Sequence, residues 1–174
     1  MTKPDFSAAL PIAHAVLRIL IILNWISGAV IATLLFAFPT RQWIMSSLHL
    51  SPSPEAEGVI LGLRAIAVVG LVGTPLNYLV LRRLLAIVET VRAGDPFVAA
   101  NASRLHAIAW ALLALQLLSL AVGAIAKAIS TPAHPFHFQA GFSISGWLAV
   151  LLTFLLARVF AEGTRMREDL EGTV

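Results

Sequence analysis

The sequence has no cysteine, and only 12% of its 174 residues are charged. The missing thiols exclude disulfides, thiolate nucleophiles and thiolate metal sites, and they leave the compartment undecided. Soluble domains carry about 25% charged residues, so the shortage of charge argues against an ordinary soluble domain. Hydrophobic residues make up 59% of the sequence instead, and they gather in long runs.

Four apolar runs account for this composition. Each is near or above the roughly 20 residues that a helix needs to cross a hydrocarbon core about 30 Å thick. None shows the alternation of a barrel strand, so each is expected to be a helix that satisfies its own backbone in lipid. The first run lacks a small-residue cleavage site and is interpreted as a retained span. The predicted spans are 12–38, 59–81, 105–129 and 142–160.

The sequence therefore predicts an all-α fold, an integral membrane four-helix bundle with up-down-up-down order and one transmembrane domain over residues 1–174. Lys and Arg concentrate on the cytoplasmic side of membrane proteins. Nine of the 12 basic residues fall on one side if the chain crosses four times, and three fall on the other. Both termini, the segment 82–104 and the tail 161–174 are therefore predicted to be cytoplasmic. The net charge of +3 then reflects topology and needs no nucleic-acid partner. The nine are Lys3, Arg18, Arg82, Arg83, Arg92, Arg104, Arg158, Arg165 and Arg167, and the three are Arg41, Arg64 and Lys127.

Polar side chains within the spans are functional candidates, because lipid penalises them. Asn24 and Gln116 fall near mid-membrane, and each is followed three residues later by a serine, Ser27 and Ser119, on the same helical face. We predict that spans one and three meet through this polar layer, with each hydrogen bond contributing roughly 0.6–2 kcal/mol. A ligand or ion site made by the same residues is the alternative.

Acidic residues are missing from the spans, although a proton-coupled carrier or pump usually needs one. No nucleophile–base pair, glycine-rich phosphate loop or carboxylate pair stands at usable spacing, so the chain is not predicted to be an enzyme, and no cofactor is expected. Histidines leave two alternatives, a bis-histidine haem at His14 and His106 and a metal bound by His134 and His137. Two ligands do not make a zinc site, so no metal site is predicted.

The charged segment between spans two and three contains a helix, a stop and a new start. In "RRLLAIVETVRAG" the apolar residues of 84–91 lie mostly on one face, which predicts an amphipathic helix continuing span two at the cytoplasmic surface. Gly94 supplies a left-handed stop, and Asp95-Pro96 makes a turn. Phe97 is expected to point at the end of the bundle or at a partner. Asn101 is predicted to be the N-cap of the next helix.

The tail after Gly163 is predicted to be a short charged helix. Its carboxylates are expected to pair with arginines of the central segment or with a basic DNA-binding domain; solvated charges are the alternative. Exposed ion pairs contribute only about 0–1 kcal/mol, so Phe97 and the apolar face of 84–91 would have to supply buried area for a partner.

Two motifs resemble a known family. The stretch "LLAIVETVRAGDPFVAANASRLHAIAW" has a leucine-rich helix, a glycine followed by x-Pro-Phe, then Asn-x-x-x-Leu and a new span. The ending "VFAEGTRMREDLEGTV" has a Phe, a Gly, a basic-acidic helix and a terminal Thr-Val. Both resemble domain-of-unknown-function family 2975, small four-span bacterial membrane proteins, although Gly172 stands where that family usually has an aliphatic residue. The matching residues are Gly94, Pro96, Phe97, Asn101, Leu105, Phe160, Gly163, Asp169, Thr173 and Val174.

The resemblance implies a regulatory role, because members are commonly encoded beside a short Cro/CI-type helix-turn-helix regulator. It implies a multi-pass protein of the bacterial inner membrane that sequesters this regulator or relays a signal to it. One alternative is a small-molecule transporter or channel, built as an oligomer, with a path along Asn24, Gln116, Arg64 and Asn77. Another is a haem or quinone redox protein, and self-association stays open. The candidate partner-binding residues are Arg82, Arg83, Arg92, Gly94, Asp95, Pro96, Phe97, Asn101, Arg104, Arg165 and Asp169.

Overall fold

The computed structural model describes residues 6–36, 54–130 and 141–171, and these ranges contain four helices and no strand. The helices are α1 (Phe6–Phe36), α3 (Pro54–Arg92), α4 (Ala99–Ile129) and α5 (Ile144–Glu171). Each is long and apolar enough to cross a membrane. The predictions of an all-α fold and of four apolar helices are therefore confirmed, and the chain is a multi-pass membrane protein. Helix α3 also runs unbroken through 82–92, as predicted for the continuation of span two, and its place at the cytoplasmic surface stays a prediction.

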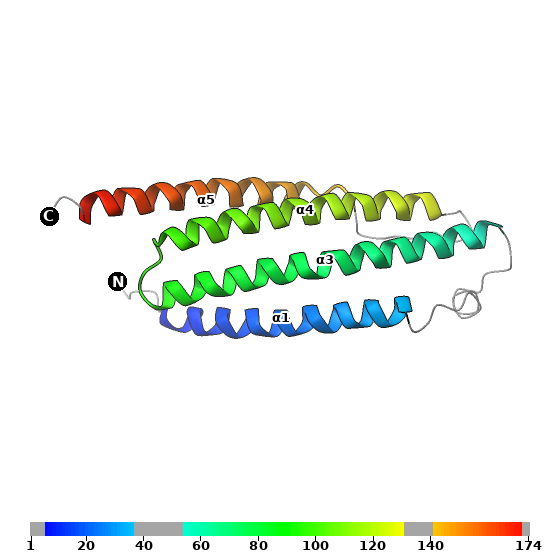
Figure 1. The fold of residues 1–174 in the computed structure, drawn as a ribbon, viewed down its shortest axis with the longest axis horizontal. Coiled ribbons are helices and arrows are strands. Elements are labelled where there is room, and N and C mark those ends of the chain that lie inside the picture. Colours follow the sequence, from blue (N-terminus) through cyan, green and yellow to red (C-terminus); the bar gives the residue numbers. More distant parts are fainter. Residues whose placement is uncertain (1–5, 37–53, 131–140, 172–174) are drawn as a thin grey trace.

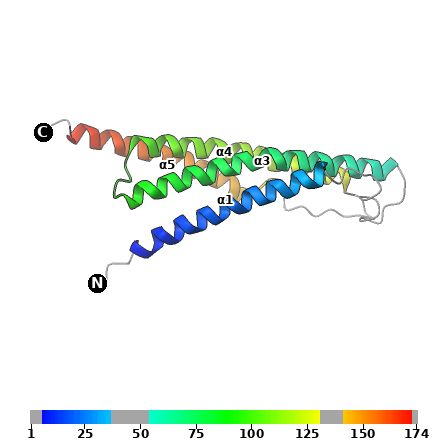
Figure 2. The same ribbon diagram turned by 60° about the horizontal axis from the view of Figure 1, so that its bottom comes forward.

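The four helices form a row in the order α1, α3, α4, α5 (Figure 1). Within the described ranges α1 packs on α3, α3 on α4, and α4 on α5, and no other pair of helices is in contact. The start of α1, the turn between α3 and α4, and the end of α5 lie at one end of the molecule (Figures 1 and 2). We call this end, which carries both family motifs, the motif end.

Each contact between neighbouring helices contains a glycine that admits a side chain from the next helix. A Cβ on Gly28 of α1 would lie 2.7 Å from Cγ2 of Thr74 on α3. A Cβ on Gly62 of α3 would lie 2.3 Å from Cγ2 of Ile129 on α4, and one on Gly146 would lie 1.4 Å from the amide nitrogen of Gln116. Small residues of this kind allow helices to approach closely in lipid, where no hydrophobic driving force brings them together.

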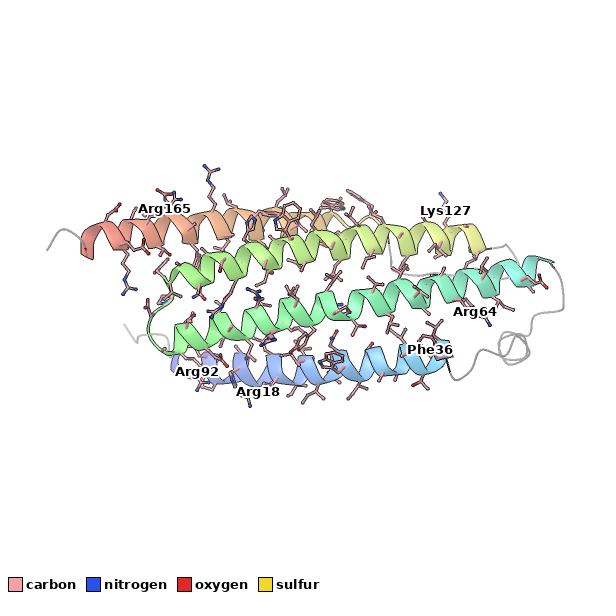
Figure 3. All side chains as sticks on the ribbon, viewed as in Figure 1. Arg18, Phe36, Arg64, Arg92, Lys127 and Arg165 are labelled. Carbon is pink, nitrogen blue, oxygen red and sulfur yellow. The ribbon has the colours of Figure 1, made fainter. Side chains whose placement is uncertain are left out.

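The basic residues labelled in Figure 3 lie towards the two ends of the molecule along the helix axes. Arg18, Arg92 and Arg165 lie near the motif end, and Arg64 and Lys127 lie near the other (Figure 3). Along α3 the rise from Arg64 to Arg82 is about 27 Å at 1.5 Å per residue, close to the thickness of a hydrocarbon core. Residues 84–92 of α3 consequently extend beyond this length of helix.

Candidate functional site

The end of α3 is closed by a Schellman motif. Gly94 has a φ of +85°, which glycine adopts without the steric cost that a Cβ brings. Its N–H donates to the carbonyl of Val91 at 3.1 Å, and the N–H of Asp95 donates to the carbonyl of Thr90 at 3.1 Å. This pair of bonds satisfies carbonyls that the helix leaves open, and Pro96 prevents the helix from continuing. The stop predicted at Gly94 is confirmed.

Asn101 fastens the turn between α3 and α4, which we call the corner (residues 93–98). Its side chain is fully buried. The amide nitrogen donates to Oγ1 of Thr90 at 2.7 Å and to the carbonyl of Pro96 at 2.9 Å, and the amide oxygen accepts from Arg104 Nη1 at 2.8 Å. The same Nη1 donates to the carbonyl of Ala86 at 3.3 Å. These bonds link α3, the corner and α4 in one network whose buried amide is satisfied on both sides.

The predicted capping role of Asn101 is wrong. Helix α4 begins at Ala99, its N-cap is Val98, and no side chain caps it. The backbone N–H of Asn101 donates to the carbonyl of Val98 at 2.8 Å, so Asn101 lies inside the first turn. Its side chain therefore points back to the corner and to α3.

The corner packs against the C-terminal part of α5. The rings of Phe97 and Phe160 have centroids 5.3 Å apart. A Cβ on Gly163 would lie 3.3 Å from Cδ1 of Phe97, so this glycine leaves room for the ring. Arg167 forms an ion pair with Asp95, with both side chains about half exposed. The two family motifs thus contact each other, and Phe97 points at the end of the bundle while 45% of its surface stays exposed.

Two expectations for this end are corrected. The ion pair joins a basic tail residue, Arg167, to an acidic corner residue, Asp95, which is the reverse of the expected polarity. The apolar face of 84–91 is also occupied, because Leu84 and Ile87 pack against the core cluster that contains Leu105. The residues Thr173 and Val174, together with Gly172, lie outside the described residues.

The predicted meeting of spans one and three through a polar layer is wrong, because α3 lies between them. Asn24 donates from its amide nitrogen to the carbonyl of Thr74 on α3 at 3.1 Å. Gln116 instead lies against Gly146 of α5. Ser119 Oγ binds both the N–H and the carbonyl of Gly141, at 3.2 and 3.3 Å, while Ser27 is exposed.

The two histidines of the haem alternative lie on helices that are not in contact among the described residues. His14 on α1 has its Nε2 3.7 Å from Oε1 of Glu89 on α3. His106 on α4 accepts a 3.0 Å hydrogen bond from Trp110 and lies edge-on to Phe154 of α5. The described residues also contain no group of three or more His, Asp or Glu side chains that could hold a metal ion. His134 and His137 lie outside them.

Gly163→Val is expected to weaken the contact between the corner and α5 by about 1–2 kcal/mol, because the new side chain enters the space occupied by Phe97. Hydrogen exchange over residues 93–98 measures the loosening. Glu162→Val is the control, since it places the same β-branched residue at an exposed neighbouring position. Equal exchange in the two variants would contradict the packing role of Gly163.

A family model described as "Protein of unknown function (DUF2975)" matches residues 65–174. The matched residues include the corner, all of α4 and all of α5, whereas α1 lies before them. No curated protein and no solved structure matches the chain.

Proposed function

The chain belongs to the DUF2975 family, proteins of unknown function, and we propose that it is a regulatory membrane protein. In this proposal its motif end faces the cytoplasm and binds a small helix-turn-helix regulator, which it sequesters or to which it relays a signal. The membrane is the bacterial inner membrane, with both termini inside. The excess of basic residues near the motif end supports this orientation.

The observation that carries the proposal is the contact between the corner and the end of α5. Three contacts join these two segments, which are far apart in the sequence. They are the ring contact of Phe97 with Phe160, the close approach of Phe97 to Gly163, and the ion pair of Arg167 with Asp95. A joined surface beyond the apolar part of the helices provides an ordered platform for a soluble protein, whereas two separate helix ends would first have to be ordered on binding.

The exposed side chains of this end suit a partner that is basic and partly apolar. Phe97 and Met166 are exposed apolar residues, at 45% and 56%, and Glu168 is an exposed carboxylate on the last turns of α5. DNA-binding domains carry clustered Lys and Arg, which a carboxylate attracts. Buried aromatic anchors supply most of the affinity at such interfaces, and charge contributes orientation.

The transporter or channel alternative requires one polar path, and the described residues do not bring its side chains together. Asn24 lies between α1 and α3, Gln116 lies between α4 and α5, and Arg64 is exposed towards the far end. The regulatory proposal is therefore the one that the geometry supports best.

Co-purification tests the proposal. The full chain is co-expressed with a helix-turn-helix protein encoded beside it, and the two are extracted together in detergent. We expect a stoichiometric complex that Phe97→Ala weakens more than Phe160→Ala, because only the first change removes the exposed ring. Glu168→Lys should lower the affinity for the regulator about two- to fivefold. The control is Glu57→Lys, which makes the same change on α3 at the other end of the molecule and should leave the affinity unchanged. A folded membrane protein that never retains the regulator would overturn the proposal.

A further inference from the structure

A cavity of about 500 Å³ opens between α3 and α4, where the apolar part of α3 ends. We call it the arginine cavity. Three cationic side chains line it, together with apolar and aromatic residues that stand about one turn and two turns before the arginine pair on α3. The lining includes Arg82, Arg83, Arg104, Tyr78, Leu79 and Pro75.

The sequence of α3 puts these residues on one face. Pro75 is followed by Tyr78 and Leu79, and then by Arg82 and Arg83, at spacings of three and four residues. Side chains at these spacings stack along one side of a helix. The stripe therefore changes along its length from apolar, through a tyrosine, to doubly cationic. A phospholipid has the same order from the membrane core outward: acyl chains, then the glycerol esters at the membrane interface, then the phosphate.

Arg104 completes the cavity from α4, in a fixed orientation. Its Nη1 donates to the carbonyl of Ala86 and to Oδ1 of Asn101, which positions the guanidinium beside the arginine pair of α3. A guanidinium has N–H donors on three nitrogens. Nε and Nη2 make no hydrogen bond or ion pair with any described residue, so they are available to an anion.

The arginine cavity carries no compensating negative charge in the ranges that the structure describes. Arg82 and Arg83 are exposed and have no carboxylate or carbonyl partner there, and no acidic residue lines the cavity. The three positive charges around the cavity repel each other. A bound anion attracts all three and so offsets this repulsion. Arginine suits a phosphate in particular, because its planar fork matches two phosphate oxygens.

We propose that the arginine cavity binds the phosphate of an anionic phospholipid, with an acyl chain lying along Leu79 and Pro75. The apolar part of its lining favours a lipid over free phosphate. Arg82 stands about 27 Å along α3 from Arg64, so the two arginines mark the two surfaces of a hydrocarbon core. Basic pockets between membrane helices at this level bind anionic headgroups. The site lies deeper than the corner and would operate whether or not a regulator binds there.

Native mass spectrometry of the purified full chain tests the site, with phosphatidylglycerol and zwitterionic phosphatidylcholine as the probe lipids. Removal of one arginine near an anionic headgroup is expected to lower the affinity for the lipid about fivefold, and removal of two about 30-fold. We therefore expect Arg82→Gln with Arg83→Gln to weaken phosphatidylglycerol binding about 30-fold. Arg104 stays unchanged, because it also holds Asn101. The control pair, Arg92→Gln with Arg165→Gln, removes the same charge from exposed positions outside the cavity and should change little.

Three results would overturn the proposal. Equal losses in the cavity pair and the control pair would mean that general positive charge holds the lipid. Equal affinity of the unmodified chain for phosphatidylcholine and phosphatidylglycerol would remove the preference for an anionic headgroup. Displacement of phosphatidylglycerol by millimolar inorganic phosphate would assign the cavity to the free anion. None of these measurements involves the regulator, so they are independent of the proposed function.

Discussion

Gly62→Ala is expected to destabilise the packing of α3 on α4 by about 1–3 kcal/mol. The new Cβ would lie 2.3 Å from Cγ2 of Ile129, a distance that real Cβ atoms essentially never show. Ile129 cannot easily give way, because a β-branched side chain in a helix is confined to one preferred rotamer, and this one is buried. The helices must therefore separate, and they lose contacts along the rest of their interface.

Gly58 provides the control for this prediction, since it lies one turn earlier on α3. A Cβ at Gly58 meets nothing within 4 Å, so Gly58→Ala should be neutral or slightly stabilising, as alanine is the better helix former. Gly146→Ala should destabilise the protein more than Gly58→Ala and less than Gly62→Ala, because the close neighbour of Gly146 is the flexible amide end of Gln116. Thermal unfolding in detergent, followed by tryptophan fluorescence, measures the order. Equal midpoints for the Gly58 and Gly62 variants would contradict the close approach.

The number and type of helices could be predicted from the sequence because lipid imposes a strict condition on it. A span needs roughly 20 apolar residues whatever it packs against, and the four runs meet this condition. The extension of α3 through 82–92 was also predictable, since "RRLLAIVETVR" keeps a helical period and no proline interrupts it. The glycine stop followed from a local rule that involves only neighbouring residues.

The order of the helices could not be predicted in this way. Hydropathy gives no information on which helix lies next to which, and the equal spacing in Asn24–Ser27 and Gln116–Ser119 suggested a contact that does not exist. The useful signal was the small residues, because Gly28, Gly62 and Gly146 each mark a helix contact. Their partners are ordinary side chains on other helices, which the sequence does not identify.

The site was only partly visible in the sequence. The motif residues were identified through the family resemblance, and the stop at Gly94 followed from local rules. The pairing of Phe97 with Phe160 joins residues 63 positions apart, so no local pattern predicts it. The role of Asn101 was missed for a similar reason. A short polar residue near a helix start is usually a cap, and its true partners, Thr90 and Arg104, are set by how α3 and α4 pack.

Asn101→Ala is expected to cost about 2–3 kcal/mol, because it removes three hydrogen bonds of a fully buried side chain to partly buried partners at once. The Pro96 carbonyl loses its donor, Thr90 Oγ1 loses the amide N–H, and Arg104 loses the oxygen that fixes its guanidinium. The loss at Arg104 is the largest of the three, because hydrogen bonds to a charged group contribute more than those between neutral groups, although its Nη1 keeps the bond to the Ala86 carbonyl. The corner should open first, so hydrogen exchange at the amides of Gly94 and Asp95 should rise more than exchange in the middle of α5.

Asn101→Asp separates the two functions of this side chain. The carboxylate still accepts from Arg104, but it cannot donate to the carbonyl of Pro96 and repels it instead. Arg104 should therefore stay in place while exchange at the corner rises. Ser103→Ala is the control, since Ser103 is exposed and its hydroxyl donates only to the nearby carbonyl of Ala100. If Asn101→Ala loosens the corner no more than Ser103→Ala does, the network does not hold α3 to α4. The corner would then depend on the Schellman bonds at Gly94 and on its contacts with α5, and Gly163→Val would become the more damaging change.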